Sequence, residues 1–271
     1  MKIRESLIKI LSYFDNFNHP LTAQELHKFL WRSDDEDFGE FFEYLDEHNI
    51  ESIKKQDSYY YLQGSEDSIR TRQRRVSLME DKMKIAVKAA KKISWIPFLQ
   101  GVFVCNTLAM GSADKDSDID FFIVTKPGRI WLVRAIVTFV LSLFRLRRTN
   151  RRVEDKVCLS FYCSSDALDM SEVSIDQPDI YMIYWLSNLI PLYDNNDIQE
   201  KIFESNDWVE DYTSNALQKY KQSHRWRVEN GKVKGGIKKM LEKFWSGSYG
   251  DVVDNQAKEA QRMKMKMNFH T

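Results

Sequence analysis

Cysteine and histidine are scarce in this chain of 271 residues, and their spacing argues against several classes of protein. The three cysteines, Cys105, Cys158 and Cys163, stand in or beside apolar runs and lack the spacing of a zinc site. We therefore expect buried free thiols in a reducing compartment rather than disulfides. The five histidines are scattered and form no metal-ligand motif. Neither a disulfide-stapled scaffold nor a Cys/His zinc module is expected.

Long apolar runs and targeting segments are also missing. The most apolar stretch, Ala135 to Phe144, is too short to span a bilayer, so we expect a buried helix packed on a sheet. Residues Met1 to Glu5 begin an amphipathic helix rather than a signal peptide, which makes the cytoplasm the expected location. Hydrophobic residues make up 43% of the sequence, which is enough to build a packed core.

A net charge is lacking too, because 40 basic and 40 acidic side chains cancel. The two signs are nevertheless separated along the chain. Residues 1–63 hold 13 acidic and 7 basic side chains, whereas residues 213–271 hold 5 acidic and 13 basic ones. The two ends can therefore attract each other or present separate faces to different partners. A solvated surface with no partner is an equally simple interpretation.

What the chain does contain is a pair of aspartates at the start of a buried strand. Asp118 and Asp120 flank Ile119 and lead into the apolar run Phe121 to Val124. Side chains alternate along a strand, so the two carboxylates project from one face, about 7 Å apart, while Ile119 points into the core. Two like charges held so close repel each other unless a cation lies between them. Carboxylate oxygens suit hard divalent cations, so we predict a site for Mg²⁺ or Mn²⁺ here.

The surrounding segment, CNTLAMGSADKDSDIDFFIVT (Cys105 to Thr125), resembles the signature of the DNA polymerase beta-like nucleotidyltransferase superfamily. The chain also looks like uncharacterised bacterial nucleotidyltransferase-domain proteins. In the superfamily, a strand ending in Gly-Ser precedes a short loop and an Asp-hydrophobic-Asp strand. The resemblance implies an α/β (α+β) fold, in which a small mixed sheet is flanked by helices. It also implies metal-dependent transfer of a nucleoside monophosphate from a nucleoside triphosphate to a hydroxyl acceptor.

Two pairs of residues compete for the Gly-Ser position of that signature. Gly111-Ser112 has the same letters but lies only a few residues before the aspartates. Asn106-Thr107 directly follows the apolar strand and leaves a loop of the usual length, and we prefer it. Asn tolerates a positive φ better than most residues, so the turn can form. The resemblance then implies that Asp118 and Asp120 hold the metal, while Asn106, Thr107 and Ser117 offer donors to phosphate oxygens.

The family also implies a third carboxylate on a later strand, which helps to hold a second metal ion. The candidate strand is KVCLSFYC, Lys156 to Cys163, where alternation presents Ser160 or Tyr162 to the site. Neither is acidic, and the nearest acids lie outside the strand: Glu154, Asp155, Asp166 and Asp169. This departure, with the altered Gly-Ser pair, favours an alternative. The chain would then be a catalytically degraded protein that acts by binding a nucleotide or another protein.

Residues 1–65 resemble a winged helix-turn-helix. An apolar stripe from Ile3 to Phe14 predicts the first helix, Thr22 and Glu25 predict a capping box for the second, and Phe38 to Leu45 predict the third. Ile50 to Ile53 and Tyr59 to Leu62 read as the strands of a wing. The third helix is strongly acidic and would repel a duplex, so DNA binding by a transcriptional regulator is a disfavoured alternative. Docking to a protein partner, dimerisation with a second copy, or structural cover for the catalytic domain fits the module better.

The rest of the chain is expected to form three further segments. These are a connecting helix (66–97), a nucleotidyltransferase-like core (98–175) and a helical C-terminal extension (176–271). Within the extension we predict a helix over 177–193, a turn at Pro191 to Asp194 and another helix through Ile202 to Val209. Beyond Asn230 we predict a lysine-rich amphipathic helix, and Met263 to Phe269 indicate a short terminal strand or a truncated end. The partner of the lysine-rich helix is the catalytic domain, another subunit or a membrane surface.

The role of one group of arginines and the identity of the substrates stay open. The arginines from Arg145 to Arg152 either contact a phosphate-bearing substrate or solvate a loop. The acceptor of the transferred nucleotide is a protein, an RNA end or a small molecule, and the sequence does not choose among them or among the four nucleotides.

Overall fold

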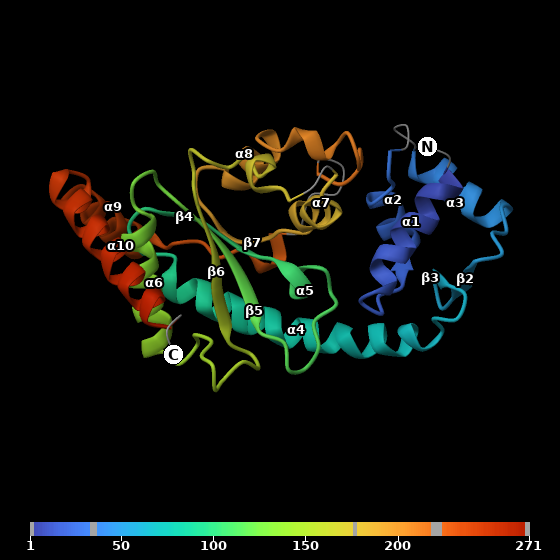
Figure 1. Cartoon of the computed structure of the whole chain (residues 1–271), viewed down its shortest axis with the longest axis horizontal. Coiled ribbons are helices and arrows are strands. Elements are labelled where there is room, and N and C mark those ends of the chain that lie inside the picture. Colours follow the sequence, from blue (N-terminus) through green and yellow to red (C-terminus); the bar gives the residue numbers. More distant parts are fainter. Residues whose placement is uncertain (1–2, 33–36, 176–177, 218–223, 269–271) are drawn as a thin grey trace.

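The computed structural model describes residues 3–32, 37–175, 178–217 and 224–268. It shows a mixed α/β protein with two small sheets, which confirms the predicted fold class at this level. Figure 1 shows an N-terminal module at one end of an elongated molecule, a four-stranded sheet in the middle, and a pair of helices at the other end. Within the described ranges, no helix combines the length and the apolar character that a bilayer crossing requires.

The N-terminal module combines three helices with a three-stranded antiparallel sheet of order β1-β3-β2. Its elements are α1 (Ile3–Asp15), β1 (Leu21–Thr22), α2 (Ala23–Lys28), α3 (Phe38–Glu47), β2 (Ile53–Gln56) and β3 (Tyr59–Leu62). The predicted capping box at the start of α2 is present, because the Thr22 hydroxyl accepts from the Glu25 N–H and the Glu25 carboxylate accepts from the Thr22 N–H. Helices α1, α2 and α3 form in the three predicted segments, so the three predicted helices are confirmed.

The predicted position of the first hairpin strand is wrong. The strand begins at Ile53 rather than Ile50, and Gln56 pairs with Tyr59. The two residues between them, Asp57 and Ser58, have φ values of 51° and 68°. A two-residue turn with both residues in the left-handed region matches the twist of the flanking strands. This turn places the first strand farther along the chain than the apolar residues indicate, whereas the second strand occupies the predicted residues, Tyr59 to Leu62.

Helix α4 (Asp67–Ile93) joins the module to the rest of the protein, as the predicted connecting helix. Two arginines in its first half contact the N-terminal module, and one of them also contacts the loop before the paired aspartates. Arg72 forms an ion pair of 2.6 Å with Glu25 of α2. Arg75 donates to the Phe17 carbonyl at 2.6 Å, and its Nη2 lies 2.7 Å from Asp114 Oδ2 in the loop before the paired aspartates. One arginine on α4 thus ties the N-terminal module to the loop of the candidate site.

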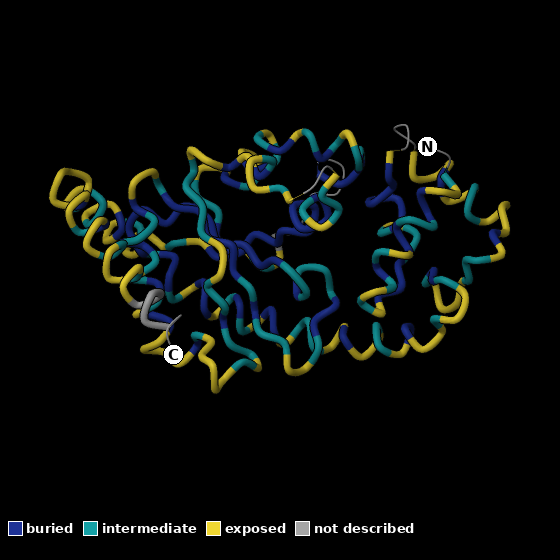
Figure 2. The backbone as a smooth tube through the Cα atoms, viewed as in Figure 1, coloured by how far each residue is buried: buried dark blue, intermediate teal, exposed yellow. Residues whose placement is uncertain are grey.

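The central sheet has four strands in the order β6-β5-β4-β7. They are β4 (Leu99–Val104), β5 (Ile119–Thr125), β6 (Val157–Ser164) and β7 (Ile190–Asp194). Strand β6 runs parallel to β5, whereas β4 is antiparallel to both of its neighbours, so the sheet is mixed. Figure 2 shows the middle of the sheet as the buried centre of the molecule.

Alternate residues of β5 belong to different cores. Ile119, Phe121 and Ile123 pack with residues of α4 and of α6 (Ile130–Leu143). Phe122 and Val124 pack with residues of α7 (Ile180–Ser187) and of the N-terminal module. The strict alternation along β5 therefore places the side chains of Asp118 and Asp120 on the α7 side of the sheet.

The predicted helix over 177–193 is wrong in part, and the predicted turn at Pro191 to Asp194 is wrong; Gln177 lies outside the described residues. Helix α7 ends at Ser187, and Pro191 to Asp194 belong to strand β7. Strand β7 is at the edge of the sheet, where a residue without an N–H is tolerated, and the register of β4 shifts beside Pro191. The apolar run from Ile180 to Ile190 conceals the boundary between the helix and the strand.

The C-terminal part is mostly helical, and one prediction there is wrong. Met263 to Asn268 continue helix α10 rather than forming a strand, while Phe269 lies outside the described residues. Met and Lys both favour helices, so their alternation does not indicate a strand by itself. The remaining elements are short helix α5 (Asn106–Ala109), α8 (Ile198–Glu204), α9 (Lys232–Trp245), α10 (Ser248–Asn268) and the 3₁₀ turns Ser171–Val173, Asp207–Val209 and His224–Trp226.

Candidate functional site

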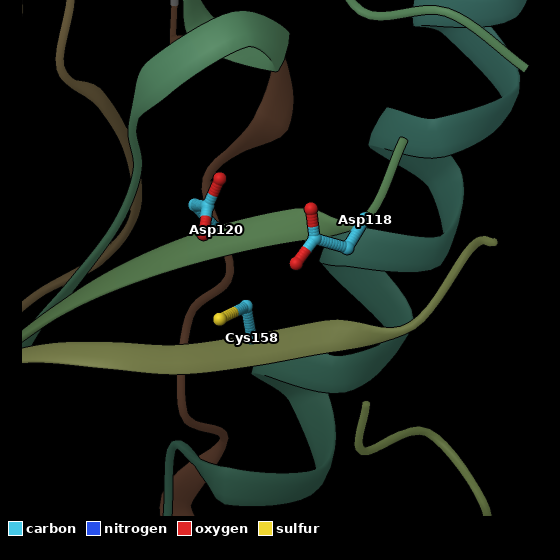
Figure 3. A group of neighbouring side chains, drawn as sticks. All are labelled: Asp118, Asp120 and Cys158. Carbon is cyan, nitrogen blue, oxygen red and sulfur yellow. The ribbon is translucent and has the colours of Figure 1, made fainter. Parts of the chain in front are cut away.

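Two carboxylates and one thiol meet where β5 begins. Asp118 immediately precedes β5 and Asp120 is its second residue, while Ile119 between them is fully buried on the opposite face. In the parallel register of β5 and β6, Asp120 stands beside Cys158. A carboxylate oxygen from each aspartate and the Cys158 sulfur lie within 4.8 Å of one another (Figure 3). The predicted convergence of the two aspartates is therefore present.

The strand that was expected to supply a third acid supplies a cysteine instead. Ser160 is on the same face, because its hydroxyl lies 2.7 Å from the Cys158 sulfur. The prediction for Tyr162 is wrong. Its ring packs in the core on the other side of the sheet, 5.0 Å from the Arg134 guanidinium. The alternation fails because β6 has one more residue than β5 between the pairs Asp120–Cys158 and Phe122–Phe161, which is a bulge.

Asn106 is the residue that connects the end of β4 with the aspartates. Its φ is 56°, so the expected positive φ at this turn is confirmed. Its side-chain oxygen accepts hydrogen bonds from Trp185 Nε1 at 2.9 Å and from the Tyr181 hydroxyl at 3.0 Å, both on α7. The Asn106 side chain is also close enough to Asp120 to lower the pKa of that carboxyl. The two aromatic donors therefore fix the amide so that its NH₂ group serves the carboxylate.

The ionisation of Asp120 reflects its surroundings. Partial burial raises its pKa above the ordinary value, and the neighbouring charge of Asp118 raises it further. The Asn106 side chain opposes both effects. Burial also raises the pKa of the Cys158 thiol, and the charge of Asp120 acts in the same direction. The negative charge is concentrated enough that a cation would stabilise it.

A guanidinium contacts the same cluster. Arg148 Nη1 lies 2.6 Å from Asp118 Oδ2 and 3.8 Å from the Cys158 sulfur. The arginine side chain is 45% exposed, whereas that of Asp118 is 18% exposed. Of the basic residues between Arg145 and Arg152, Arg148 is the one placed beside the predicted metal ligands. It also borders a groove along the outer edge of β6 with Cys158 and Ser160.

Ser117 and Thr107, which the resemblance implies as phosphate ligands, contribute to the loop in the structure. The Ser117 hydroxyl accepts from the Asp114 N–H at 3.0 Å, and the Thr107 carbonyl accepts from the Ser112 N–H at 2.8 Å. Gly111, of the competing Gly-Ser pair, faces Arg72 of α4 and His19 of the N-terminal module. Asn106, of the preferred pair, is the residue whose side chain lowers the pKa of Asp120.

A buried lysine that sequence reasoning missed organises the same loop. The Lys82 side chain is 3% exposed, and its ammonium donates to the carbonyls of Lys115 and Ser117 at 2.9 and 2.8 Å. It also forms an ion pair of 2.7 Å with Asp155, just before β6. Lys82 therefore joins the segments that precede β5 and β6. In the sequence it is one lysine among many on a long polar helix, so no local signal marks it.

The three side chains of the cluster differ in how well they suit the expected ion. Asp118 and Asp120 offer oxygen ligands, which suit Mg²⁺ and Mn²⁺. The Cys158 sulfur is a soft ligand and does not replace a third carboxylate for such ions. The two aspartates therefore suit one hard cation, whereas Cys158, which occupies the third ligand position, does not. Comparison of the chain with protein-family models, with curated proteins and with solved structures gives no match.

Proposed function

We propose that this protein is a metal-dependent nucleotidyltransferase of the DNA polymerase beta-like type, which moves a nucleoside monophosphate from a nucleoside triphosphate to a hydroxyl acceptor. One observation carries the proposal: the carboxylates of Asp118 and Asp120 converge on one face of a mixed sheet, beside the positive-φ turn at Asn106. The segment that contains these residues is the one that resembles the superfamily signature.

In this proposal, some residues hold the metal ion and others contact the phosphates of the nucleoside triphosphate. Asp118 and Asp120 hold Mg²⁺ or Mn²⁺, which supplies charge neutralisation and orientation of the phosphates when bound. Asn106 keeps the Asp120 carboxylate in place, and Thr107 and Ser117 offer donors at the rim of the site. Arg148 already contacts Asp118, so it is placed to pair with a phosphate oxygen once an ion takes over that carboxylate.

A second candidate function is supported by two particular contacts. Cys158 stands where the resemblance implies a third carboxylate, and Arg148 supplies the positive charge beside Asp118 without any metal. Both features suit a protein that has the fold but has lost catalysis, and that acts by binding a nucleotide or another protein. The two candidates differ in whether pyrophosphate is released.

The N-terminal module is proposed to be a winged helix that contacts protein. Its helix α3 carries Glu40, Glu43, Asp46 and Glu47, and two of its aromatic residues, Phe38 and Phe42, are 40% and 45% exposed. Carboxylates repel DNA phosphates, whereas exposed aromatic rings suit a protein interface. A protein partner or a second copy of the chain is therefore favoured over DNA.

Calorimetric titration with each of the four nucleoside triphosphates, with Mg²⁺ present, tests the proposal. We expect one nucleotide to bind, and pyrophosphate to be released in the presence of its acceptor. Asp118→Asn and Asp120→Asn should each abolish release. Asp116→Asn is the matched control, because Asp116 is exposed in the adjoining loop and should leave release unchanged. Nucleotide binding without release would favour the second candidate. No binding of any nucleotide would exclude the transferase and leave only the form of the second candidate that binds another protein.

A further inference from the structure

Helix α9 exposes four of its apolar side chains and turns two of its charged ones, Lys238 and Glu242, inward. Val233, Ile237, Met240 and Phe244 are 77%, 41%, 64% and 68% exposed. Their spacing of four, three and four residues puts them in one stripe along the helix. Figure 2 shows α9 and α10 as a largely exposed pair at the end of the molecule. Such an outward apolar stripe is typical of a surface that binds something else.

The inward side of α9 is held by polar contacts. The buried Lys238 ammonium donates to the Leu99 carbonyl and, at 2.9 Å, to the Tyr193 hydroxyl. The Glu242 carboxylate accepts from the Phe98 N–H at 2.8 Å and from Lys126 at 3.0 Å. Because these contacts join α9 to strands β4 and β7 and to the end of β5, the orientation of the helix is fixed. The outward stripe is therefore a feature of the folded protein.

The apolar stripe continues past the end of α9. The ring of Phe244 lies 6.0 Å from that of Tyr249, at the start of α10. Tyr249 is 60% exposed and Val252, one helical turn later, is 52% exposed. Apolar side chains thus cover the outer side of α9 and the adjoining first turns of α10. We call this set the outer stripe: Val233, Ile237, Met240, Phe244, Tyr249 and Val252.

A row of lysines runs beside the outer stripe. Lys232, Lys239 and Lys243 are exposed, and their spacing of seven and four residues places them together on one flank of α9. The acidic residue of α9, Glu242, is on the inward side and is paired with Lys126. An exposed apolar stripe with lysines along its flank is typical of a helix that lies in the interface of an anionic membrane.

A basic groove adjoins the first turn of the same helix. Lys234 lines this groove with Lys88 and Lys91 of α4 and with Arg225 and Trp226, and all of its charged lining residues are lysine or arginine. The Lys234 ammonium donates to the Lys91 carbonyl at 2.9 Å, which connects α9 with the groove. Positive charge is therefore present both along the stripe and at its end, which suits phosphate headgroups.

We propose that the outer stripe and its lysine row bind the surface of an anionic phospholipid bilayer, with the apolar residues among the acyl chains and the lysines among the headgroups. Nucleic acid would leave the exposed aliphatic residues without a partner. A second copy of the chain, packed antiparallel and stripe against stripe, would bring two lysine rows together, and like charges repel. The bilayer satisfies both the apolar and the basic parts of the surface.

Flotation of the full chain with vesicles tests this proposal. One set of vesicles contains phosphatidylcholine alone, and the other adds phosphatidylglycerol or phosphatidylserine. We expect binding to the anionic vesicles that weakens as salt rises. The triple variant Lys232→Glu, Lys239→Glu, Lys243→Glu should lower the affinity about 100-fold or more, because each surface lysine contributes about fivefold. The double variant Ile237→Asp, Phe244→Asp should abolish binding, since it puts charge among the acyl chains.

Matched controls carry the same changes elsewhere on the surface. Lys55→Glu, Lys115→Glu, Lys201→Glu alters the net charge equally, and Val76→Asp places a carboxylate at an apolar position that is 56% exposed. Both should float like the parent chain, and circular dichroism should show every variant folded. Absence of flotation with anionic vesicles, equal loss in the controls, or a dimer that only the stripe variant dissociates would each overturn the proposal. The last result would assign the stripe to a second copy.

Discussion

The indole N–H of Trp185 donates to Asn106 Oδ1 at 2.9 Å, across 79 residues of chain. An amide has an acceptor at one end and donors at the other, so this contact turns the NH₂ group of Asn106 toward Asp120. The Trp185 ring also packs against Phe122 at 5.1 Å, which keeps the indole in place. A residue of helix α7 thus positions a carboxylate that it does not touch.

Trp185→Phe should weaken metal binding and leave the fold intact. Phenylalanine keeps the contact with Phe122 but cannot donate to Asn106, so the amide loses one of the two bonds that orient it. Loss of such an outer contact lowers metal affinity by about 10-fold or more. Titration with Mn²⁺, followed by electron paramagnetic resonance, measures the effect. The matched control is Trp208→Phe, since Trp208 donates to Asn206 instead. Equal affinity of the Trp185 variant and the parent chain would show that Asn106 is held without the indole.

Cys158→Asp should strengthen Mg²⁺ binding at the site. An aspartate there places a third carboxylate beside Asp118 and Asp120, and oxygen ligands suit Mg²⁺ better than sulfur does. We expect a rise in Mg²⁺ affinity of about 10-fold, measured by calorimetry, and a corresponding gain in any pyrophosphate release. Cys158→Asn is the matched control, because it has nearly the same shape without the charge. If both variants bind Mg²⁺ equally, residue 158 is not a ligand position.

The raised pKa of Asp120 predicts how stability varies with pH. Because the pKa of this carboxyl is higher in the folded chain than its ordinary value of 3.8, folding favours the protonated form. The folded state then binds more protons than the unfolded state between the two pKa values, so stability falls as pH rises through that window. The Asp120→Asn variant has no carboxyl to ionise at this position, so its stability does not fall for this reason as pH rises. Urea unfolding should show the variant more stable than the parent chain at pH 7 and equal to it below pH 3.

The exposed neighbour Asp116 supplies the comparison for that pH series. Asp116→Asn should change the stability little at any pH, because its carboxylate is surrounded by water. A stability gain in Asp120→Asn that is the same at all pH values would contradict the explanation, since it would not arise from ionisation.

Lys82→Met should destabilise the protein by about 3 kcal/mol. Methionine fills the space of the lysine stem, but the carbonyls of Lys115 and Ser117 and the Asp155 carboxylate lose their shared donor. Removing one partner of a buried ion pair costs about 3–5 kcal/mol, and Asp155 is exposed enough to recover part of this from water. Urea unfolding measures the cost. Lys84→Met, on the exposed side of the same helix, should cost less than about 0.5 kcal/mol.

Local features of the site could be predicted from the sequence because they depend on neighbouring residues. The strand after Asp120, the burial of Ile119 and the positive φ of Asn106 all follow from short patterns. The position of Cys158 beside the aspartates could also be predicted, since the alternation that presents Ser160 to the site presents residue 158 as well. Because the expected third ligand was a carboxylate, Cys158 was not predicted to lie at the site.

Contacts between distant segments could not be predicted in this way. Lys82 and Asp155 are 73 residues apart, and Arg148 and Asp118 are 30 apart, so no spacing in the sequence links either pair. Strand β7 was missed for a related reason. Its Pro191 is acceptable only because the strand is at an edge, and the position of a strand in its sheet depends on the whole fold.

Arg75 holds the Phe17 carbonyl with one nitrogen and the Asp114 carboxylate with another. Helix α4 carries this arginine as part of 27 unbroken residues, and a helix of that length resists bending. Displacing the N-terminal module therefore pulls on the loop that ends at Asp118. The N-terminal module and the loop that leads to Asp118 therefore share one anchoring side chain, Arg75, on a single helix.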